Sequence, residues 1–409
     1  MASALALLGA CGSGQPRDPA LSPSNASGAS EAGVSASTPQ ACERSLVADA
    51  ASCAPPTLST PTLQIAVDSM HACAWRRSGP VSCWGRNGTG ELGDPSLQDH
   101  ALPTVVPNLH DVLQVTVGDW GLVGFSCALL ADHTVSCWGA NQEGQLGDGT
   151  ISPYRATPAP IANLADVVEI ATGSHHTCAR LSNGEVRCWG MGRACGIGDG
   201  QCEDRLTPVS PYGLADVAQL ALGMTFSCAR KNDGTLLCWG ANGDGEVGVG
   251  SQIGVLVPTQ VPGLTGVVRI SASNNNPCAQ TADGRVFCWG VDQYGWLGNC
   301  SSTYAVTTPV EAHGVPCGGA LMPGSHCVVT ATNAAACWGT WSGDGSYMPH
   351  TEGAVPVPLS GIVATAGYRS LFAIGLDGRV WSWGYNESGQ LGDGTTANRW
   401  TPMAIQAPP

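Results

Sequence analysis

Short strand-like runs, each ended by a turn signal, recur along most of the chain. Between residues 167 and 190, two such runs flank the pair Asn183-Gly184. A tight hairpin needs a left-handed residue at this point, and Asn-Gly supplies it. Three later units have Asp-Gly there, and two units have Asp132-His133 or Thr332-Asn333, whose His and Asn also tolerate positive φ. The pattern predicts an antiparallel β-hairpin in each unit.

The hairpins belong to a repeat that is marked by tryptophan. Cys-Trp-Gly or Ser-Trp-Gly recurs seven times, at spacings of 45 to 54 residues. The tryptophans are Trp84, Trp138, Trp189, Trp239, Trp289, Trp338 and Trp383. Such a period is typical of circular β-repeat proteins, and seven units are a common number for closing a propeller. The sequence therefore predicts an all-β, seven-bladed β-propeller.

Twelve cysteines fit the predicted hairpins. They form six pairs whose members are ten residues apart: Cys73-Cys83, Cys127-Cys137, Cys178-Cys188, Cys228-Cys238, Cys278-Cys288 and Cys327-Cys337. With the turn centred on Asn183, Cys178 and Cys188 face each other across the two strands, within disulfide range. We expect six disulfides inside the blades. The seventh unit has Phe372 and Ser382 at these positions.

Three further disulfides are expected in loops. The chain has 19 cysteines, and setting Cys11 aside leaves an even number. We expect the pairs Cys195-Cys202, Cys300-Cys317 and Cys42-Cys53. Zinc is the competing interpretation, but C-x2-C pairs, the strong zinc signal, are absent from the sequence. The sequence predicts no metal site and no cofactor.

The beginning of the chain resembles a bacterial lipoprotein signal. Residues 1–11 are a short apolar run that ends in Leu-Gly-Ala-Cys, although no basic residue precedes Arg17. The resemblance implies cleavage before Cys11 and lipidation of Cys11. Residues 12–56 are rich in Ser, Ala, Gly and Pro, which predicts a disordered, flexible tether. The propeller is then expected over 57–409.

Composition and charge argue against two classes of partner and indicate the compartment in which the protein is located. The formal net charge is −14, charged residues are 12%, and Lys231 is the single lysine. Without a basic cluster, binding to nucleic acid or electrostatic docking on anionic lipid is not expected. Many disulfides require an oxidising compartment. We expect a monomer in a bacterial cell envelope, lipid-anchored at the outer membrane or cell surface, or a secreted protein.

A second motif lies between the hairpins. Residues 138–149 and 383–394 both follow W-G-x-N-x-x-G-Q-L-G-x-G, and Thr-Pro pairs follow downstream. This arrangement resembles the repeat of the regulator of chromosome condensation family, over about residues 58–406. The resemblance implies a seven-bladed propeller whose C-terminal strand, near 401–406, completes the first blade. The family's exchange activity on a nuclear small GTPase is not expected of an exported protein.

The sequence departs from the family pattern in three places. The second unit carries extra residues at 118–125, and the third and sixth units lack the asparagine-bearing loop, at 191–196 and 340–347. Loops on a rigid scaffold carry recognition, and aromatic residues dominate interface hot spots. The candidate binding residues are Trp120, Tyr154, Trp296, Tyr304, Trp341 and Tyr347. Packing against neighbouring loops is the alternative role for each.

Catalytic motifs are absent from the sequence. We find no G-x-S-x-G elbow, H-E-x-x-H, phosphate loop or dinucleotide fingerprint. His71 and His176 occupy a repeat position that elsewhere holds Phe125 or Phe226, so we interpret it as a packing position. We therefore expect no enzyme but a binding module that displays its loops to a protein or glycan. The alternative is an exported polysaccharide or peptide hydrolase or lyase with clustered carboxylates in the channel.

Overall fold

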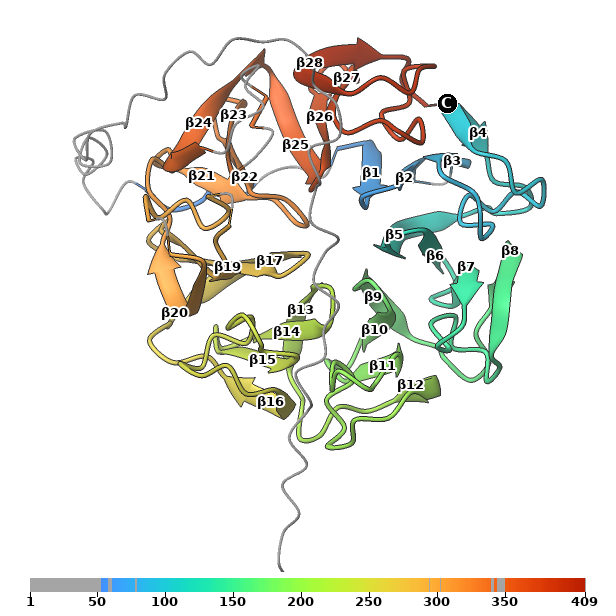
Figure 1. Ribbon diagram of the computed structural model, residues 1–409, viewed down its shortest axis with the longest axis horizontal. Helices are drawn as coiled ribbons and strands as arrows, with labels where there is room; N and C mark the ends of the chain where they lie inside the picture. The colour runs from blue at the N-terminus through green and yellow to red at the C-terminus, as the bar shows by residue number, and fades with distance from the viewer. Residues whose placement is uncertain are drawn as a thin grey trace, which may run out of the picture.

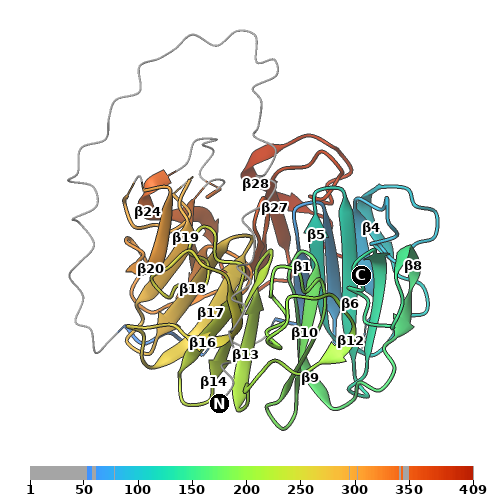
Figure 2. The same cartoon turned by 60° about the horizontal axis from the view of Figure 1, so that its bottom comes forward.

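The computed structural model describes residues 53–57, 61–77, 79–293, 295–301, 303–339, 342–343 and 350–408. These residues form seven four-stranded antiparallel sheets around a central axis (Figure 1). The tilted view of Figure 2 shows the strands running between the two faces of the ring. The all-β, seven-bladed propeller is therefore confirmed. Among the described residues, no helix is long and apolar enough to span a membrane.

Each blade follows chain order from the innermost strand to the outermost. Blade one contains β1 (Leu63–Val67), β2 (His71–Arg76), β3 (Val81–Gly85) and β4 (His100–Val105). Blade two contains β5 (Val112–Trp120), β6 (Val123–Leu130), β7 (Val135–Asn141) and β8 (Ser152–Pro160). Blade three contains β9 (Val167–Thr172), β10 (His176–Leu181), β11 (Val186–Gly190) and β12 (Arg205–Val209).

The remaining four blades repeat this order. Blade four contains β13 (Val217–Leu222), β14 (Phe226–Lys231), β15 (Leu236–Gly240) and β16 (Val255–Gln260). Blade five contains β17 (Val267–Ser273), β18 (Asn276–Thr281), β19 (Val286–Val291) and β20 (Ala305–Glu311). Blade six contains β21 (Gly319–Leu321), β22 (Cys327–Thr330), β23 (Ala334–Gly339) and β24 (His350–Ser360). Blade seven contains β25 (Ile362–Gly367), β26 (Ser370–Gly375), β27 (Val380–Gly384) and β28 (Arg399–Ile405).

The middle two strands of each blade form the predicted hairpin. In blade three, Cys178 lies directly opposite Cys188, and their Cα atoms are 4.1 Å apart. All six hairpin pairs are disulfide-bonded. The turn residues Gly184, His133 and Asn333 have φ values of 82°, 66° and 59°. The hairpin turns lie on one face of the ring, and we call it the turn face.

Two of the three expected loop disulfides are wrong. Cys195 is bonded to Cys202 as expected, but Cys53 is bonded to Cys317, which excludes both Cys42-Cys53 and Cys300-Cys317. The segment between Cys300 and Cys317 contains the seven-residue strand β20. Extended strands rise about 3.3 Å per residue, so the two cysteines lie at opposite ends of a strand about 20 Å long, beyond disulfide reach. Cys300 is disulfide-bonded too.

Cys53 reaches Cys317 because residues 53–57 lie against the turn face of blades five and six. The Cys53 carbonyl approaches Gly284 in a hairpin turn so closely that a Cβ there would lie 1.9 Å from the oxygen. The Arg269 guanidinium also donates to the Pro56 carbonyl at 2.8 Å. The end of the predicted tether is therefore fastened to the propeller. Residues 1–52, with Cys11 and Cys42, lie outside the described residues, so the signal segment, the lipidation and the rest of the tether stay predictions.

The prediction for closing the ring is also wrong. β28 pairs with β27 and is the outer strand of blade seven, whereas blade one is built entirely from β1–β4. The Thr-Pro strands are the last strands of their own blades, so no strand is left over for blade one. The seam between blades seven and one is closed by side-chain packing and by a backbone hydrogen bond from the Gly394 N–H to the Ala101 carbonyl at 2.9 Å. Trp84 packs edge-on against Phe372 and donates to the Gln390 carbonyl at 2.9 Å.

The contact at the seam is one instance of a contact that joins the blades around the ring. The tryptophan indoles are almost fully buried between blades. At six interfaces the indole N–H donates to a loop carbonyl of the preceding blade, at 2.8–3.0 Å. The acceptors are the carbonyls of Glu91, Gln145, Gly196, Glu246, Trp296 and Gln390. Because the acceptor is the backbone, the side chain at this loop position is free to vary.

Glutamine side chains join the innermost strands. The Gln114 amide donates to the Ile170 carbonyl at 2.8 Å and accepts from the Ile170 N–H at 2.9 Å. Gln219 makes the same two bonds with Ile270. In blade three the equivalent position of the innermost strand holds Glu169 instead of a glutamine. Its carboxylate accepts from the Leu220 N–H of blade four and pairs with Arg180 of its own blade. The wall of the central channel is therefore bonded from blade to blade.

The glycine that follows the loop carbonyl provides the first test of this packing. A Cβ on Gly198 would lie 2.5 Å from the Trp239 indole nitrogen, whereas Gly213 has open space around it. Both have positive φ, so alanine at either site carries about 1–2 kcal/mol of backbone strain. We expect Gly198→Ala to lower the free energy of unfolding by about 2 kcal/mol more than Gly213→Ala, because only it displaces the indole. Urea denaturation of both variants measures the difference, and equal losses would contradict the packing role.

The Cys53–Cys317 disulfide provides the second test. Its sequence separation is 264, against 7 for Cys195–Cys202. In the chain-entropy description a loop of that length contributes up to roughly 5 kcal/mol, and the short loop roughly 2–3 kcal/mol. Replacing Cys53 and Cys317 together by Ser should therefore destabilise the protein more than replacing Cys195 and Cys202 together. Denaturation under oxidising conditions compares the two, and the reverse order would contradict a closing role for the long-range disulfide.

Candidate functional site: the mouth of the central channel

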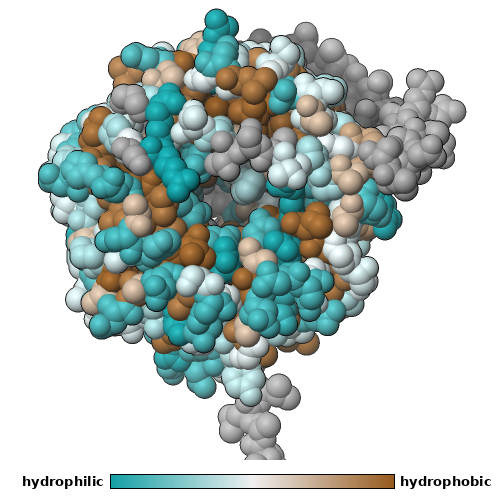
Figure 3. Space-filling model, turned by 180° about the vertical axis from the view of Figure 1, so that it is seen from behind, coloured by the Kyte–Doolittle hydropathy of each residue, from teal (hydrophilic) through white to brown (hydrophobic). Residues whose placement is uncertain are grey.

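The innermost strands surround a cavity of about 580 Å³ on the ring axis. A space-filling view shows the hollow at the middle of one face (Figure 3). Pro61 and Arg269 line its end near the turn face. The other end, which we call the mouth, is lined by residues at the ends of the innermost strands and in the loops that follow them. These include Asp68, Asp119, Trp120, Met224 and Tyr368.

A longer hairpin in blade two projects at the mouth. β5 has nine residues and β6 has eight, whereas β9 and β10 have six each. The extra residues predicted at 118–125 continue the ladder until Trp120 faces Val123. Leu122 at the tip is 62% exposed. This extension places Asp119 and Trp120 on the wall of the cavity.

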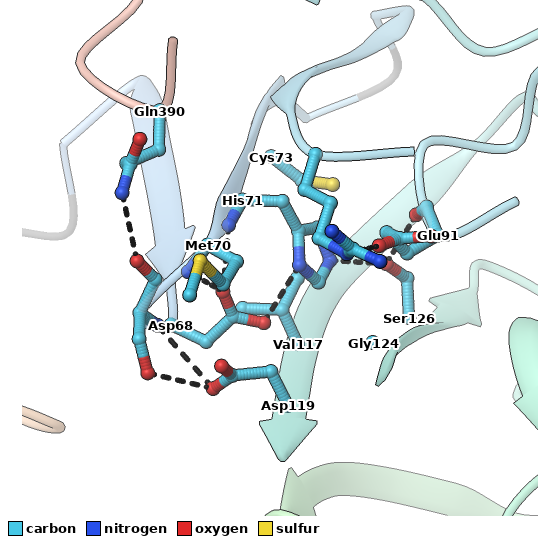
Figure 4. Close-up of polar contacts among 12 residues, drawn as sticks. Asp68, Met70, His71, Cys73, Glu91, Val117, Asp119, Gly124, Ser126 and Gln390 are labelled. Carbon is cyan, nitrogen blue, oxygen red and sulfur yellow. Dashed lines mark hydrogen bonds and ion pairs between the residues drawn. The ribbon is translucent and has the colours of Figure 1, made fainter. Parts of the chain in front are cut away.

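Asp119 reaches blade one through Ser69. Its Oδ1 accepts from the Ser69 hydroxyl at 3.0 Å and from the Ser69 N–H at 3.3 Å (Figure 4). Asp68 lies on the other side of Ser69, and its Oδ1 accepts from the backbone N–H groups of Met70 and His71. Burial, reinforced by the negative charge of Asp68, raises the pKa of Asp119 to about 7. The hydrogen bonds from Ser69 offset only part of this effect.

Beneath this pair, Asp68, His71 and Ser126 form a buried chain. His71 Nδ1 lies 2.7 Å from Asp68 Oδ2, and Nε2 lies 2.9 Å from the Ser126 hydroxyl. The order resembles a hydrolase triad, but His71 and Ser126 are fully buried and the Ser126 hydroxyl donates to the Glu91 carbonyl at 2.8 Å. A serine whose only proton is bonded to a carbonyl is not activated by the imidazole. The chain therefore joins blades one and two.

Blade three repeats the contact without the carboxylate. His176 Nε2 lies 2.8 Å from the Ser227 hydroxyl, which donates to the Gly196 carbonyl. Burial lowers the pKa of His176 to about 3. At His71 burial acts in the same direction, but the adjacent Asp68 outweighs it and raises the pKa. The position predicted for packing is buried in both histidines, and each also makes an inter-blade hydrogen bond.

A second polar group lies beside Trp120. His175 Nδ1 is 2.5 Å from Glu143 Oε2, and Arg193 also contacts the Glu143 carboxylate. Although burial opposes the shift, His175 and Arg193 together hold the pKa of Glu143 below its usual range. The His175 ring lies 5.3 Å from the Trp120 ring, centre to centre. The described residues contain no group of three or more His, Cys, Asp or Glu side chains that could hold a metal ion.

Comparison with known proteins places this propeller in a family. Models of the regulator of chromosome condensation (RCC1) repeat match residues 78–124, 132–180, 233–279 and 377–409, and a second model of the same repeat matches 167–197 and 217–246. Together they match just over half of the chain. The chain belongs to the RCC1 repeat family. The membership agrees with the repeat and with the seven blades.

Curated relatives share only part of their length with this RCC1-repeat chain. The ultraviolet-B receptor UVR8 of Arabidopsis thaliana is 32% identical over 157 residues, which cover 35% of this chain and 33% of UVR8. The human E3 ubiquitin-protein ligase HERC2 is 31% identical over 140 residues, which cover 34% of this chain and 3% of HERC2. The chain therefore matches a third or less of these relatives.

Solved structures show the same fold over most of the chain. Human WBSCR16 superposes with a TM-score of 0.71 at 21% identity, covering 80% of this chain and 95% of WBSCR16. Yeast RCC1 (Prp20), crystallised with Kap60, also gives 0.71 at 21% identity and covers 91% of both chains. At this identity the likeness concerns the fold alone.

The six aromatic candidates do not form one site. Trp120 lines the mouth, whereas Trp296 is 6% exposed and packs against Tyr368, 5.3 Å away between ring centres. Tyr154 in β8 and Tyr304 just before β20 are exposed at the outer edges of blades two and five. Trp341 and Tyr347 lie outside the described residues. Trp120 is therefore the one described candidate on the cavity wall.

Sequence reasoning missed the acidic residues of the mouth. Asp119 lies in the segment 118–125 that departs from the RCC1 repeat, so the insertion was the available signal. Its proximity to Ser69 joins residues fifty positions apart in neighbouring blades. The sequence alone contains no motif for this contact.

Asp119 gives the third test, through the pH dependence of stability. An ordinary Asp titrates near 4, whereas the folded protein holds the pKa of Asp119 at about 7. Between these values the folded state keeps a proton that the unfolded chain releases, so raising the pH weakens the fold. We expect Asp119→Asn, which keeps the acceptor for Ser69, to be more stable than the wild type at pH 8 and nearly equal to it at pH 4.

Urea denaturation at pH 4, 6 and 8 measures this difference. The matched control is Asp233→Asn in the turn of blade four, which reproduces the Asn-Gly turn of blade three. Hydrogen bonds from Thr235 lower the pKa of Asp233, so its replacement should not stabilise the protein at pH 8. A difference between Asp119→Asn and wild type that is the same at every pH would contradict the assignment.

Proposed function

We propose that this RCC1-repeat propeller is a non-enzymatic binding module that presents the mouth of its channel to a protein or glycan outside the cytoplasm. The observation that carries the proposal is the mouth itself. A cavity of about 580 Å³ opens between rigidly joined blades, and the projecting β5–β6 hairpin places Trp120 and an exposed Leu122 beside it. An aromatic residue on a rigid support is a typical anchor for recognition.

The disulfides support the proposed location outside the cytoplasm. The described residues contain eight disulfides whose partners are both described. Such a number indicates an oxidising, extracytoplasmic environment. We further propose attachment to a bacterial envelope through a lipid on Cys11, with secretion as the alternative.

Relatives support binding to a protein. RCC1 propellers are generally non-catalytic binding modules, and yeast Prp20 binds Gsp1p and histones and has been crystallised with Kap60. Those partners belong to the yeast protein. For this chain, the relatives favour a protein partner over a glycan.

Hydrolysis is the second candidate function, because one observation favours it. Asp68 and Asp119 both line the cavity, are linked through Ser69, and the pKa of Asp119 is raised to about 7. Paired carboxylates with different environments are what acid–base hydrolysis requires. Asp68, however, is already occupied by two backbone N–H groups and by His71. Release of sugars or peptides from envelope polymers by wild type, and its loss in Asp119→Asn, would establish this function.

The fourth test locates the binding face by cross-linking. A photo-reactive amino acid replaces Leu122 at the mouth in one protein and Leu376 in another. Both leucines are strongly exposed, at 62% and 66%, but Leu376 lies in a hairpin turn on the opposite face. The full, oxidised chains are irradiated in envelope and culture-supernatant extracts of the source cells. We expect a discrete protein or glycan adduct from position 122 and none from position 376.

A competition step tests whether the adduct at position 122 comes from specific binding. Excess unlabelled wild type should abolish it, and excess Trp120→Ala protein should compete less well. An adduct only from position 376 would overturn the choice of face. No competable adduct at either position would overturn the binding module.

A further inference from the structure

Asp119, like the buried Glu246 and Asp292, has no arginine partner among the described residues, whereas several other carboxylates of the protein do. Arginine guanidinium groups pair with Asp148, Glu169, Asp199 and Asp393 at 2.5–2.7 Å. Among the described residues, the hydrogen-bond donors to Asp119 are the hydroxyl and N–H of Ser69, and no basic side chain forms an ion pair with it. Removing a carboxylate from water without a counter-ion is costly. The protein therefore maintains an uncompensated acidic group on the cavity wall.

The surroundings of Asp119 suit a cation on an apolar stem. Trp120 follows it in β5 and also lines the cavity, and Met70, Met224 and Met322 contribute thioether walls. An indole face attracts ammonium and guanidinium groups, and methionines adapt to alkyl chains. The cavity volume of about 580 Å³ lies within the usual range of roughly 300–1,000 Å³ for ligand sites. It can accept a long side chain together with part of its backbone.

Charge at the two ends of the cavity is unequal. Asp68 and Asp119 come from blades one and two at the mouth, whereas Arg269 lies near the turn face and donates to the Pro56 carbonyl. Arg369, in the loop after β25 of blade seven, places one arginine at the mouth too, where the two carboxylates outnumber it. The whole chain carries a formal charge of −14, which attracts basic partners over longer distances.

We propose that the mouth binds a basic side chain, the ammonium of a lysine or the guanidinium of an arginine, presented by the partner protein. The cation pairs with Asp119, and Asp68 contributes a second negative charge. Trp120, on the opposite face of β5 beside His175, adds aromatic wall next to the site. This inference rests on the proposed binding function and names the chemistry of the partner. It also explains why a mouth with two adjacent carboxylates contains no internal counter-ion for Asp119.

Binding of a cation is coupled to release of a proton. The pKa of Asp119 is about 7 in the free protein, and a paired cation favours its ionised form. The other charged and titratable groups of this region are Asp68 and Arg369 on the cavity wall, His71 buried against Asp68, and Glu143 and His175 beside Trp120. Burial lowers the pKa of His71, but Asp68 outweighs burial and raises it, and a protonated His71 acts in the same direction as protonation of Asp119. Affinity should therefore rise by about tenfold between pH 6 and pH 8.

The fifth test is calorimetric titration of the full, oxidised chain at low salt. The probes are capped peptides, Gly-Gly-Lys-Gly-Gly and Gly-Gly-Arg-Gly-Gly, with the acetyl-lysine peptide as the neutral match. We expect at least one basic peptide to bind, the acetylated peptide to bind at least tenfold more weakly, and Asp119→Asn to lose both the affinity and its pH dependence. Asp233→Asn, which removes the same charge on the turn face, should bind like wild type.

Several results would overturn the inference. Equal binding of the lysine and acetyl-lysine peptides excludes recognition of charge, and unchanged binding by Asp119→Asn excludes this site. Spermidine that binds in an Asp119-dependent way, with no binding of either basic peptide, would assign the site to free polyamines instead. If position 122 cross-links a partner while no basic peptide binds, this inference fails and the binding module stands. If basic peptides bind but no cross-link forms, the cation site stands without the module.

Discussion

The hydrogen bond from a buried tryptophan to a loop carbonyl of the preceding blade is the interaction on which the ring depends. A four-stranded blade satisfies its own backbone but leaves both flat faces apolar, so adjacent blades must bury them against each other. The tryptophan fills this interface with the largest apolar side chain and bonds its single polar atom to the neighbour. Six of these bonds are within 2.8–3.0 Å. The adjoining glycine leaves room for the ring, as at Gly198.

The ring closes through the same tryptophan contact, without a blade that takes strands from both ends of the chain. Blade one has all four of its own strands, so blades seven and one meet through side chains and loop contacts at the seam rather than through a shared strand. There Trp84 bonds to the Gln390 carbonyl, while the Gln390 amide donates to the Ser69 carbonyl at 2.9 Å (Figure 4). The Cys53–Cys317 disulfide adds a covalent link from the start of blade one to blade six. The seam therefore supports the residues that hold Asp119.

The mouth combines rigidity with an unsatisfied charge. Ser69 is held by blade seven, Asp68 by backbone N–H groups and His71, and Trp120 by an extended hairpin. On such a support the Asp119 carboxylate is held against Ser69 and close to Asp68. Its raised pKa is the consequence, and a basic ligand would relieve it. The histidine–serine contacts beneath the mouth, by contrast, are buried and join neighbouring blades.

Local features of this protein were determined by the sequence itself. A hairpin's register follows from its turn, so Asn183-Gly184 and the ten-residue spacing were enough to place Cys178 opposite Cys188. The tryptophan period predicted the number of blades in the same way, because each repeat forms one blade mostly from residues that are close together in the sequence. The sequence could not predict which aromatic candidates are exposed. The exposure of Tyr304 and the burial of Trp296 depend on the adjoining blade.

Only the tertiary structure decided the contacts between distant parts of the chain. Cys53 bonds to Cys317 instead of its near neighbour because residues 53–57 lie beneath blades five and six. β28 stays in blade seven because the ring geometry leaves it no place in blade one. Asp119 meets Ser69 because two blades converge at the axis. Such proximities follow from the closure of the whole ring, which no local spacing encodes.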